Sequence, residues 1–78
     1  MLEIIKVETR PDFHLHVVFS TNEEGDIDMK SYLWGEAFEP LKKKEEFEKV
    51  FLLKDLGTVA WPNGVDIAAE SLYEKLNK

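Results

Sequence analysis

The sequence predicts an α+β domain, in which a five-stranded, mostly antiparallel sheet carries a short helix and a C-terminal helix packed on one face. Two observations favour this class. In the first half of the chain, β-branched and aromatic residues alternate with polar ones, as in strands with one buried face. Near the end, residues 69–76 place apolar side chains at helical spacing. Because a chain of 78 residues would leave two separate cores too small, we expect a single domain over residues 1–78.

Composition and charge limit the classes of function. The formal net charge of -6 argues against direct nucleic-acid binding, which depends on clustered Lys and Arg. The basic run 42–44 is followed at once by glutamates, so it is interpreted as a solvated helix face. The lack of cysteine excludes disulfides, a thiolate nucleophile and zinc sites built on sulfur. No segment approaches the roughly 20 apolar residues of a membrane span. We therefore expect a cytoplasmic protein that carries no cofactor and does not act at a membrane.

The first predicted strand covers residues 2–9. Its β-branched Ile4, Ile5 and Val7 favour extended backbone. Pro11 ends the strand, since proline fixes φ and pushes the preceding residue toward extended geometry. A turn is expected at that point.

The second predicted strand covers residues 13–20. Apolar and aromatic residues occupy every second position, which assigns one face to the core and leaves the two histidines on the other. The predicted core face consists of Phe13, Leu15, Val17 and Phe19. The polar stretch 21–25 is expected to be a hairpin loop, and it leads to a third strand around residues 26–31.

The middle of the chain is predicted to be less regular. Bulky residues at positions 32–34 lie too close together for a one-sided strand, so we expect a turn or a single helical turn there. Pro40 suits the first turn of a short helix near Leu41. Residues 50–54 and 58–61 are predicted to pair as a hairpin and to supply the fourth and fifth strands.

The last predicted strand runs into a turn that precedes the C-terminal helix. Gly64 tolerates the positive φ that a turn after Pro62 and Asn63 can require. Asp66 is the predicted N-cap of the helix, where its carboxylate would accept from free N–H groups. The apolar stripe predicted to cover the sheet consists of Ala69, Leu72, Tyr73 and Leu76.

These residues also carry a resemblance to a known family. A W-x-N-G-x-D pattern stands before a short helix, and its residues, with two from the helix, are Trp61, Asn63, Gly64, Asp66, Leu72 and Tyr73. A preceding Leu-x-x-Phe-x-x-Val segment is loosely matched by Leu41, Leu53 and residues 47–50. The chain resembles, over nearly its whole length, the small bacterial family called domain of unknown function 2442. The resemblance implies a compact α+β domain, found alone or joined to a helix-turn-helix segment. It further implies a gene beside that of another small protein, an arrangement similar to a toxin–antitoxin pair.

Asp12, His14 and His16 are the candidates for chemistry. Two histidines at this spacing on a strand project from one face and can share a divalent metal, with a carboxylate as third ligand. The sequence offers no nucleophile with an assigned base and no glycine-rich phosphate loop to complete a catalytic site. Exposed or partly packed histidines are therefore the preferred interpretation of His14 and His16, and the resemblance carries no metal site to these positions.

Trp61 and Asn63 are candidates for partner binding, because tryptophan is enriched at interface hot spots. A core position for Trp61 is the alternative, and a small domain favours it because one large aromatic buries much surface. Trp34 raises the same question. If both tryptophans cannot fit one small core, at least one of them lies at an interface.

The first strand is the predicted edge for association. Its start carries only Glu3 and Lys6 as charged interruptions among apolar residues, and an open edge exposes unpaired N–H and C=O groups. We expect this edge to bind a protein partner or to form a homodimer through Ile4 and Ile5.

Two functions of different class follow from these observations. The preferred one is a protein-interaction or regulatory module that is not an enzyme, such as the antitoxin-like partner of a neighbouring small protein. The acidic composition favours this function, because charge complementarity speeds association with a basic partner. The alternative is a metal-dependent or hydrolytic enzyme that uses Asp12, His14 and His16.

Overall fold

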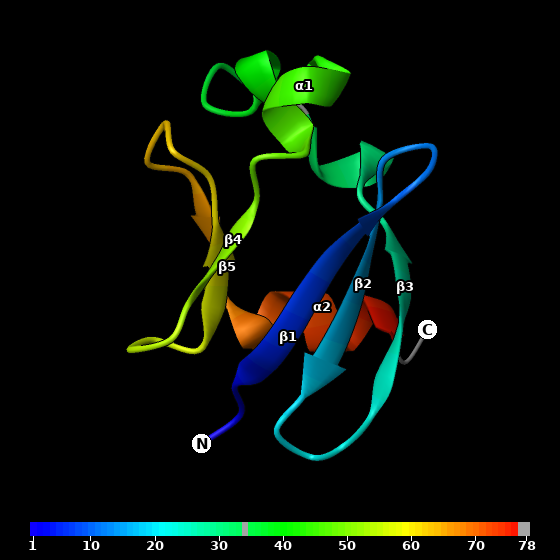
Figure 1. The fold of residues 1–78 in the computed structure, drawn as a ribbon, viewed down its shortest axis with the longest axis vertical. Helices are drawn as coiled ribbons and strands as arrows, with labels where there is room; N and C mark the ends of the chain where they lie inside the picture. Colours follow the sequence, from blue (N-terminus) through cyan, green and yellow to red (C-terminus); the bar gives the residue numbers. More distant parts are fainter. Residues whose placement is uncertain (34, 77–78) are drawn as a thin grey trace.

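The computed structural model describes residues 1–33 and 35–76 (Figure 1). The elements of the described chain are β1 (Ile4–Arg10), β2 (His14–Phe19), β3 (Glu24–Asp28), η1 (Lys30–Tyr32), η2 (Glu39–Lys42), α1 (Lys44–Phe47), β4 (Phe51–Leu53), β5 (Thr58–Ala60), β6 (Asp66–Ile67) and α2 (Ala69–Leu76). The two η elements are 3-10 helices. The α+β class is confirmed, and α2 begins at Ala69, as the apolar spacing predicts.

The strands form two three-stranded antiparallel sheets, in the orders β1-β2-β3 and β4-β5-β6. The prediction of one five-stranded sheet is therefore wrong. A sixth strand, β6, pairs with β5 directly after the turn. The edge strands β1 and β4 do not share a ladder. The two sheets meet instead at one end, where the Ile4 N–H donates to the Gly57 carbonyl oxygen at 2.8 Å.

The alternation in β2 builds the buried face of the first sheet. Leu15, Val17 and Phe19 are fully buried, which confirms their place on the core face. The next strand is displaced toward the N-terminus, from the predicted residues 26–31 to residues 24–28. The backbone then turns into η1, as expected for the bulky residues that follow.

A bulge keeps the side chains of β1 in phase with this buried face. Ile4 pairs with Phe19 and Lys6 pairs with Val18, so Ile5 is the extra residue. Ile4 is 2% exposed, whereas Ile5 is 51% exposed. The bulge thus places Ile4 on the same face as Val7, toward the core, and leaves Ile5 on the surface.

The helix α2 covers one face of the first sheet, and it runs behind β1, β2 and β3 in Figure 1. Ala69 and Leu72 are buried, and Tyr73 packs edge-on against Phe19 with the ring centroids 5.2 Å apart. The helix α1 lies at the end of the molecule where β1 ends, with Phe47 buried. It does not share the sheet face with α2, because a four-residue helix presents one core side chain and no stripe. No helix among the described residues is long and apolar enough to cross a membrane.

One hydrophobic cluster joins the two sheets and the helices. Its largest fully buried side chain is that of Trp61, which follows β5. The Trp61 ring lies against the Phe47 ring, with 6.0 Å between centroids. The core therefore extends from the second sheet to the underside of α1.

Candidate functional site

The edge of β1 that faces away from β2 is the main candidate. In an antiparallel pair, successive residues point their N–H and C=O groups alternately toward the partner strand and away from it. The Ile4 N–H points away from β2, and the bulge at Ile5 shifts the alternation by one residue. Val7 and Thr9 therefore also point their backbone groups outward. In agreement with this orientation, the Thr9 carbonyl oxygen accepts from Arg10 Nη1 at 3.3 Å.

This edge is free over part of its length. Within the described chain, the N–H and C=O of Val7 and the N–H of Thr9 have no hydrogen-bond partner. The opposite edge strand, β3, carries the exposed carboxylates of Glu24, Asp26 and Asp28, which protect it against strand addition. The β1 edge of the first sheet thus has unpaired backbone groups, and β4 and β5 of the second sheet lie near this strand.

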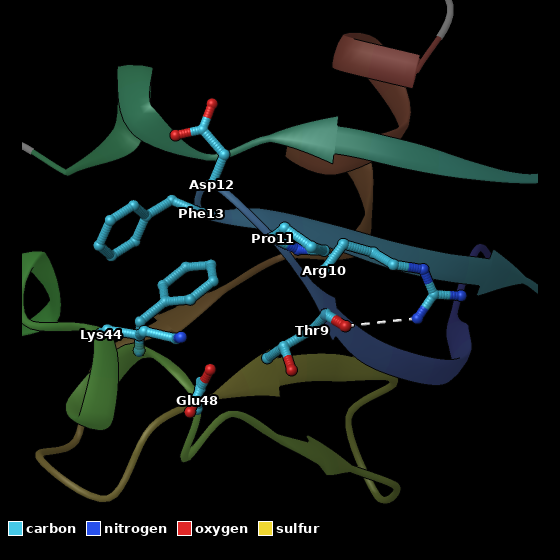
Figure 2. A pocket seen from close by; sticks show the side chains of 8 residues that line it. Thr9, Arg10, Pro11, Asp12, Phe13, Lys44 and Glu48 are labelled. Atoms are coloured by element: carbon cyan, nitrogen blue, oxygen red, sulfur yellow. Dashed lines mark hydrogen bonds between the residues drawn. The ribbon is translucent and has the colours of Figure 1, made fainter.

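A cavity of about 320 Å³ opens at the end of this edge (Figure 2). We call it the Phe13 cavity, and it is lined by Thr9, Arg10, Pro11, Asp12, Phe13, Lys44, Phe47 and Glu48. The rings of Phe13 and Phe47 form an edge-to-face pair, with centroids 5.1 Å apart. In Figure 2 the guanidinium of Arg10 and the carboxylate of Asp12 point away from these rings. The cavity therefore combines an apolar wall with a polar rim.

The β1–β2 turn presents Phe13 to this cavity in an unusual backbone conformation. Asp12 and Phe13 have φ angles of 63° and 58°. Two successive residues with positive φ suit the twist of a hairpin, but this region is strongly disfavoured for a bulky side chain. The Met29 N–H donates to the Phe13 carbonyl oxygen at 2.9 Å, and the contact with Phe47 fixes the ring. Strain of this kind is often found at binding sites.

A second cavity lies at the start of β1. We call it the Ile5 cavity, and it is lined by Glu3, Ile4, Ile5, Leu52, Lys54 and Gly57. Large exposed apolar side chains lie on the strands that border it and in the turn after β4: Ile5, Phe51 at 42% exposed and Leu56 at 60% exposed. Both ends of the free edge therefore offer apolar contact.

Between these cavities, the outer side of β1 carries a carboxylate whose charge is balanced by two neighbouring cationic side chains. Glu8 lies 3.0 Å from Lys6 Nζ and 3.0 Å from Arg10 Nη1. The hydrogen bond from Arg10, followed by that from Lys6 and by the charges of both groups, lowers the pKa of Glu8 to about 2. Glu8 is thus ionised at neutral pH without making the edge strongly acidic.

The structure gives the three predicted catalytic residues separate partners. The Asp12 carboxylate accepts from Lys30 Nζ at 2.7 Å, and this bond lowers the pKa of Asp12. His14 Nδ1 lies 3.0 Å from the Asp12 carbonyl oxygen. His16 contacts two carboxylates of β3. Among the described residues, no group of three or more His, Cys, Asp or Glu side chains is placed to hold a metal ion.

The predicted partner-binding residues occupy different environments. Trp61 and Ile4 are 1% and 2% exposed, so the core takes up both side chains and neither reaches the surface. Ile5 and Asn63 are exposed. Trp34 lies outside the described residues. Of this set, Ile5 is the residue that borders the free edge of β1.

The W-x-N-G-x-D residues build the turn that closes the second sheet. The Asn63 side chain accepts from the Val65 N–H and donates to the Ala37 carbonyl oxygen, both at 3.3 Å. Gly64 has a φ of +95°, the sign that the turn was expected to need. Asp66 lies in β6, three residues before α2 begins. It is therefore not the N-cap, because a short strand stands between the turn and the helix.

Sequence reasoning did not identify the Phe13 cavity. The available signal was an aromatic residue directly after the turn at Pro11, and it predicted only a core position for Phe13. Nothing in the sequence indicated that Lys44 and Phe47 would lie beside that turn, because their position depends on packing between distant segments.

Comparison with known proteins gives one match. A family model described as "Protein of unknown function (DUF2442)" matches residues 4–78. No curated protein and no solved structure matches the chain.

Proposed function

We propose that this chain, which belongs to the DUF2442 family, is a protein-interaction domain that binds an extended segment of a partner along the free edge of β1. The observation that carries the proposal is a set of outward backbone groups, the N–H and C=O of Val7 and the N–H of Thr9, which have no hydrogen-bond partner in the described chain and lead toward the Phe13 cavity. An added strand would gain main-chain hydrogen bonds at this edge, and one of its side chains would enter the cavity.

The surroundings of the edge favour an extended peptide segment as the bound partner. Backbone pairing supplies affinity in strand addition, and pockets for alternate side chains supply specificity. The Phe13 cavity and the Ile5 cavity provide two such pockets. Because α1 contributes a wall of the first and β4 a wall of the second, a single segment fits more readily than the edge of a second folded sheet. We therefore propose a protein partner in place of the predicted homodimer.

The partner we propose is a small basic protein encoded beside this one, met in the cytoplasm and regulated by it in the manner of an antitoxin. The net charge of -6 supports a basic partner, because complementary charge accelerates association and disfavours acidic competitors. We call this role regulatory, because a partner segment that is bound along the edge would not be free to make other contacts.

A catalytic role is not part of the proposal. Asp12, His14 and His16 contact, respectively, a lysine, a backbone carbonyl and two carboxylates. These contacts support a structural use of the three residues in the hairpin and the sheet. The metal-dependent or hydrolytic enzyme that uses the same three residues is the alternative.

Calorimetric titration of the neighbouring gene's product into wild-type protein and Thr9→Pro tests the proposal. Proline removes the outward N–H of Thr9 and is tolerated where the N–H of an edge strand faces solvent. We expect about a tenfold loss of affinity, the effect of about 1.4 kcal/mol, from one lost hydrogen bond and a blocked edge. Asp28→Pro is the matched control, because it removes an outward N–H from the opposite edge strand and leaves the contacts of His16 in place.

Two outcomes would contradict the proposal. One is equal affinity of Thr9→Pro and wild type, with both proteins folded by their amide spectra. The other is a loss of affinity in Asp28→Pro as large as in Thr9→Pro. Sedimentation equilibrium of the wild type alone distinguishes the homodimer, which would show a mass twice that of the chain.

A further inference from the structure

The outer face of the first sheet holds a histidine between two carboxylates. His16 lies on β2, on the face opposite to α2. Its Nδ1 is 2.7 Å from Asp26 Oδ1, and its Nε2 is 3.0 Å from Glu24 Oε1. Both carboxylates belong to β3, so the imidazole spans the pair of strands with both of its nitrogens.

This geometry distinguishes the two protonation states of the ring. An ionised carboxylate only accepts hydrogen bonds, and an imidazole donates from both nitrogens only when it is protonated. The protonated ring therefore makes two charge-assisted bonds to β3. The neutral ring makes one, and its other nitrogen then directs a lone pair at a carboxylate oxygen. We infer that His16 is a pH-dependent bridge that fastens β3 to the sheet when its imidazole is protonated and loosens it when the proton leaves.

The charged groups around His16 come from β1, β2 and β3. Asp26 and Glu24 lie on β3, and the hydrogen bond to Asp26 is the largest cause of the raised pKa of His16. Burial opposes this change, the hydrogen bond to Glu24 adds to it, and the charge of Arg10 on β1 opposes it. Glu8, directly opposite His16 on β1, is already paired with Lys6 and Arg10.

The remaining neighbours on this face do not complete a bond to the ring. His14 lies two residues away on β2 and contacts the Asp12 carbonyl oxygen. Asp28, opposite His14 on β3, accepts from the Lys30 N–H. The two contacts of the bridge thus depend on Asp26 and Glu24.

The direction of the pH effect follows from the protonation state that is stabilised. Because the pKa of His16 is raised in the folded protein, the bridge contributes its full stabilisation below the pKa of the unfolded chain, about 6.5. This stabilisation is lost as the pH rises through the pKa of the folded protein. β3 is an edge strand of five residues, with one neighbour in its sheet. Its amides are therefore the place where the loss of the bridge should be observed.

Imidazole nitrogen shifts of His16, followed by NMR from about pH 5 to 9, test the inference. We expect Asp26→Asn and Glu24→Gln each to lower the midpoint of the His16 titration, with the larger decrease for Asp26→Asn. Asp28→Asn is the matched control, since it removes an exposed carboxylate of the same strand that does not contact the ring. Unchanged midpoints in both first variants, or an equal decrease in Asp28→Asn, would overturn the inference.

Hydrogen exchange provides the second measurement, because a shifted midpoint alone does not show that β3 responds. Corrected for intrinsic base catalysis, the protection of the β3 amides should fall as the pH rises through the His16 midpoint. In His16→Gln, which cannot change its charge, the protection should not follow that midpoint. Protection in the wild type that is equal on both sides of the midpoint would show that His16 titrates without controlling the strand.

Discussion

The indole N–H of Trp61 donates a hydrogen bond of 2.9 Å to the carbonyl oxygen of Phe47. This bond joins the segment after β5 to the end of α1, and the rings of the same two residues are also in contact. The ring of Phe47 in turn contacts Phe13 in the Phe13 cavity. Trp61 therefore positions one wall of the proposed binding site from within the core, although its own side chain does not reach the surface.

Substitution of Trp61 by Phe should lower the free energy of unfolding by about 2–4 kcal/mol. The Phe47 carbonyl oxygen loses its donor, and the smaller ring leaves a void in a fully packed cluster. Urea denaturation measures the change. Phe51→Leu, at an exposed aromatic position of β4, is the control and should change stability by about 0.5 kcal/mol or less. Similar losses in the two variants would show that the Trp61 bond contributes nothing specific.

Two glycines with positive φ should differ in their tolerance of alanine. Gly64 has open space where a Cβ would stand, so Gly64→Ala should cost only the backbone strain, about 1–2 kcal/mol. At Gly57 the added Cβ would lie 2.5 Å from the Glu3 Cβ and 3.0 Å from its Cα. Gly57→Ala should therefore cost about 1–3 kcal/mol more. The melting temperatures of both variants show which substitution destabilises the protein more. A larger decrease for Gly64→Ala than for Gly57→Ala would contradict the packing of Gly57 against Glu3 at the junction of the sheets.

The buried stripe of α2 predicts a contrast between neighbouring positions. Leu72→Ala should destabilise the protein by about 2–5 kcal/mol, since Leu72 is fully buried against the first sheet. Glu74→Ala removes an exposed side chain of the same helix and should be within about 0.5 kcal/mol of wild type. Equal midpoints of chemical denaturation for the two variants would refute the assigned face of the helix.

The Glu8 carboxyl should titrate near pH 2 and not near its ordinary value of 4.5. Because the pKa is lower in the folded state, the contacts of Glu8 stabilise fully above about pH 4.5, and this stabilisation is lost as the pH falls toward 2. Carbon NMR of the side-chain carboxyl follows the titration. Arg10→Gln and Lys6→Gln should each raise the pKa of Glu8, because each variant removes one hydrogen bond and one positive charge from the carboxylate. A Glu8 titration that neither variant changes would contradict the ion-pair geometry.

Local patterns in the sequence were sufficient for the elements whose periodicity is strong. The alternation of β2 predicted the fully buried Leu15, Val17 and Phe19, and the helical spacing predicted the start of α2 at Ala69. β6 could not be predicted in this way, because two residues have no period and their extended form depends on pairing with β5. The division into two sheets could not be predicted either, because it depends on which strand edges pair, and no ladder joins the two sets of three strands in the described chain.

The candidate site was predictable only in part. Its strand was expected to be an edge, but the sequence could not tell which of Ile4 and Ile5 would be exposed, since the two residues are identical and the bulge decides. The Phe13 cavity requires Phe47 to reach the β1–β2 turn, and that contact depends on Trp61 and on the rest of the core. Long-range packing of this kind leaves no signal in a single sequence.

The bulge in β1 also determines where this strand can change its length. Ile5 and Lys6 together oppose Val18, so a chain that lacked Ile5 would form a regular strand in which Ile4 and Val7 still face the core. The loss of a residue beyond Lys6 would instead turn every later side chain to the opposite face. Deletions among sequences with this fold should therefore concentrate at Ile5, where one residue can be lost without moving the free edge.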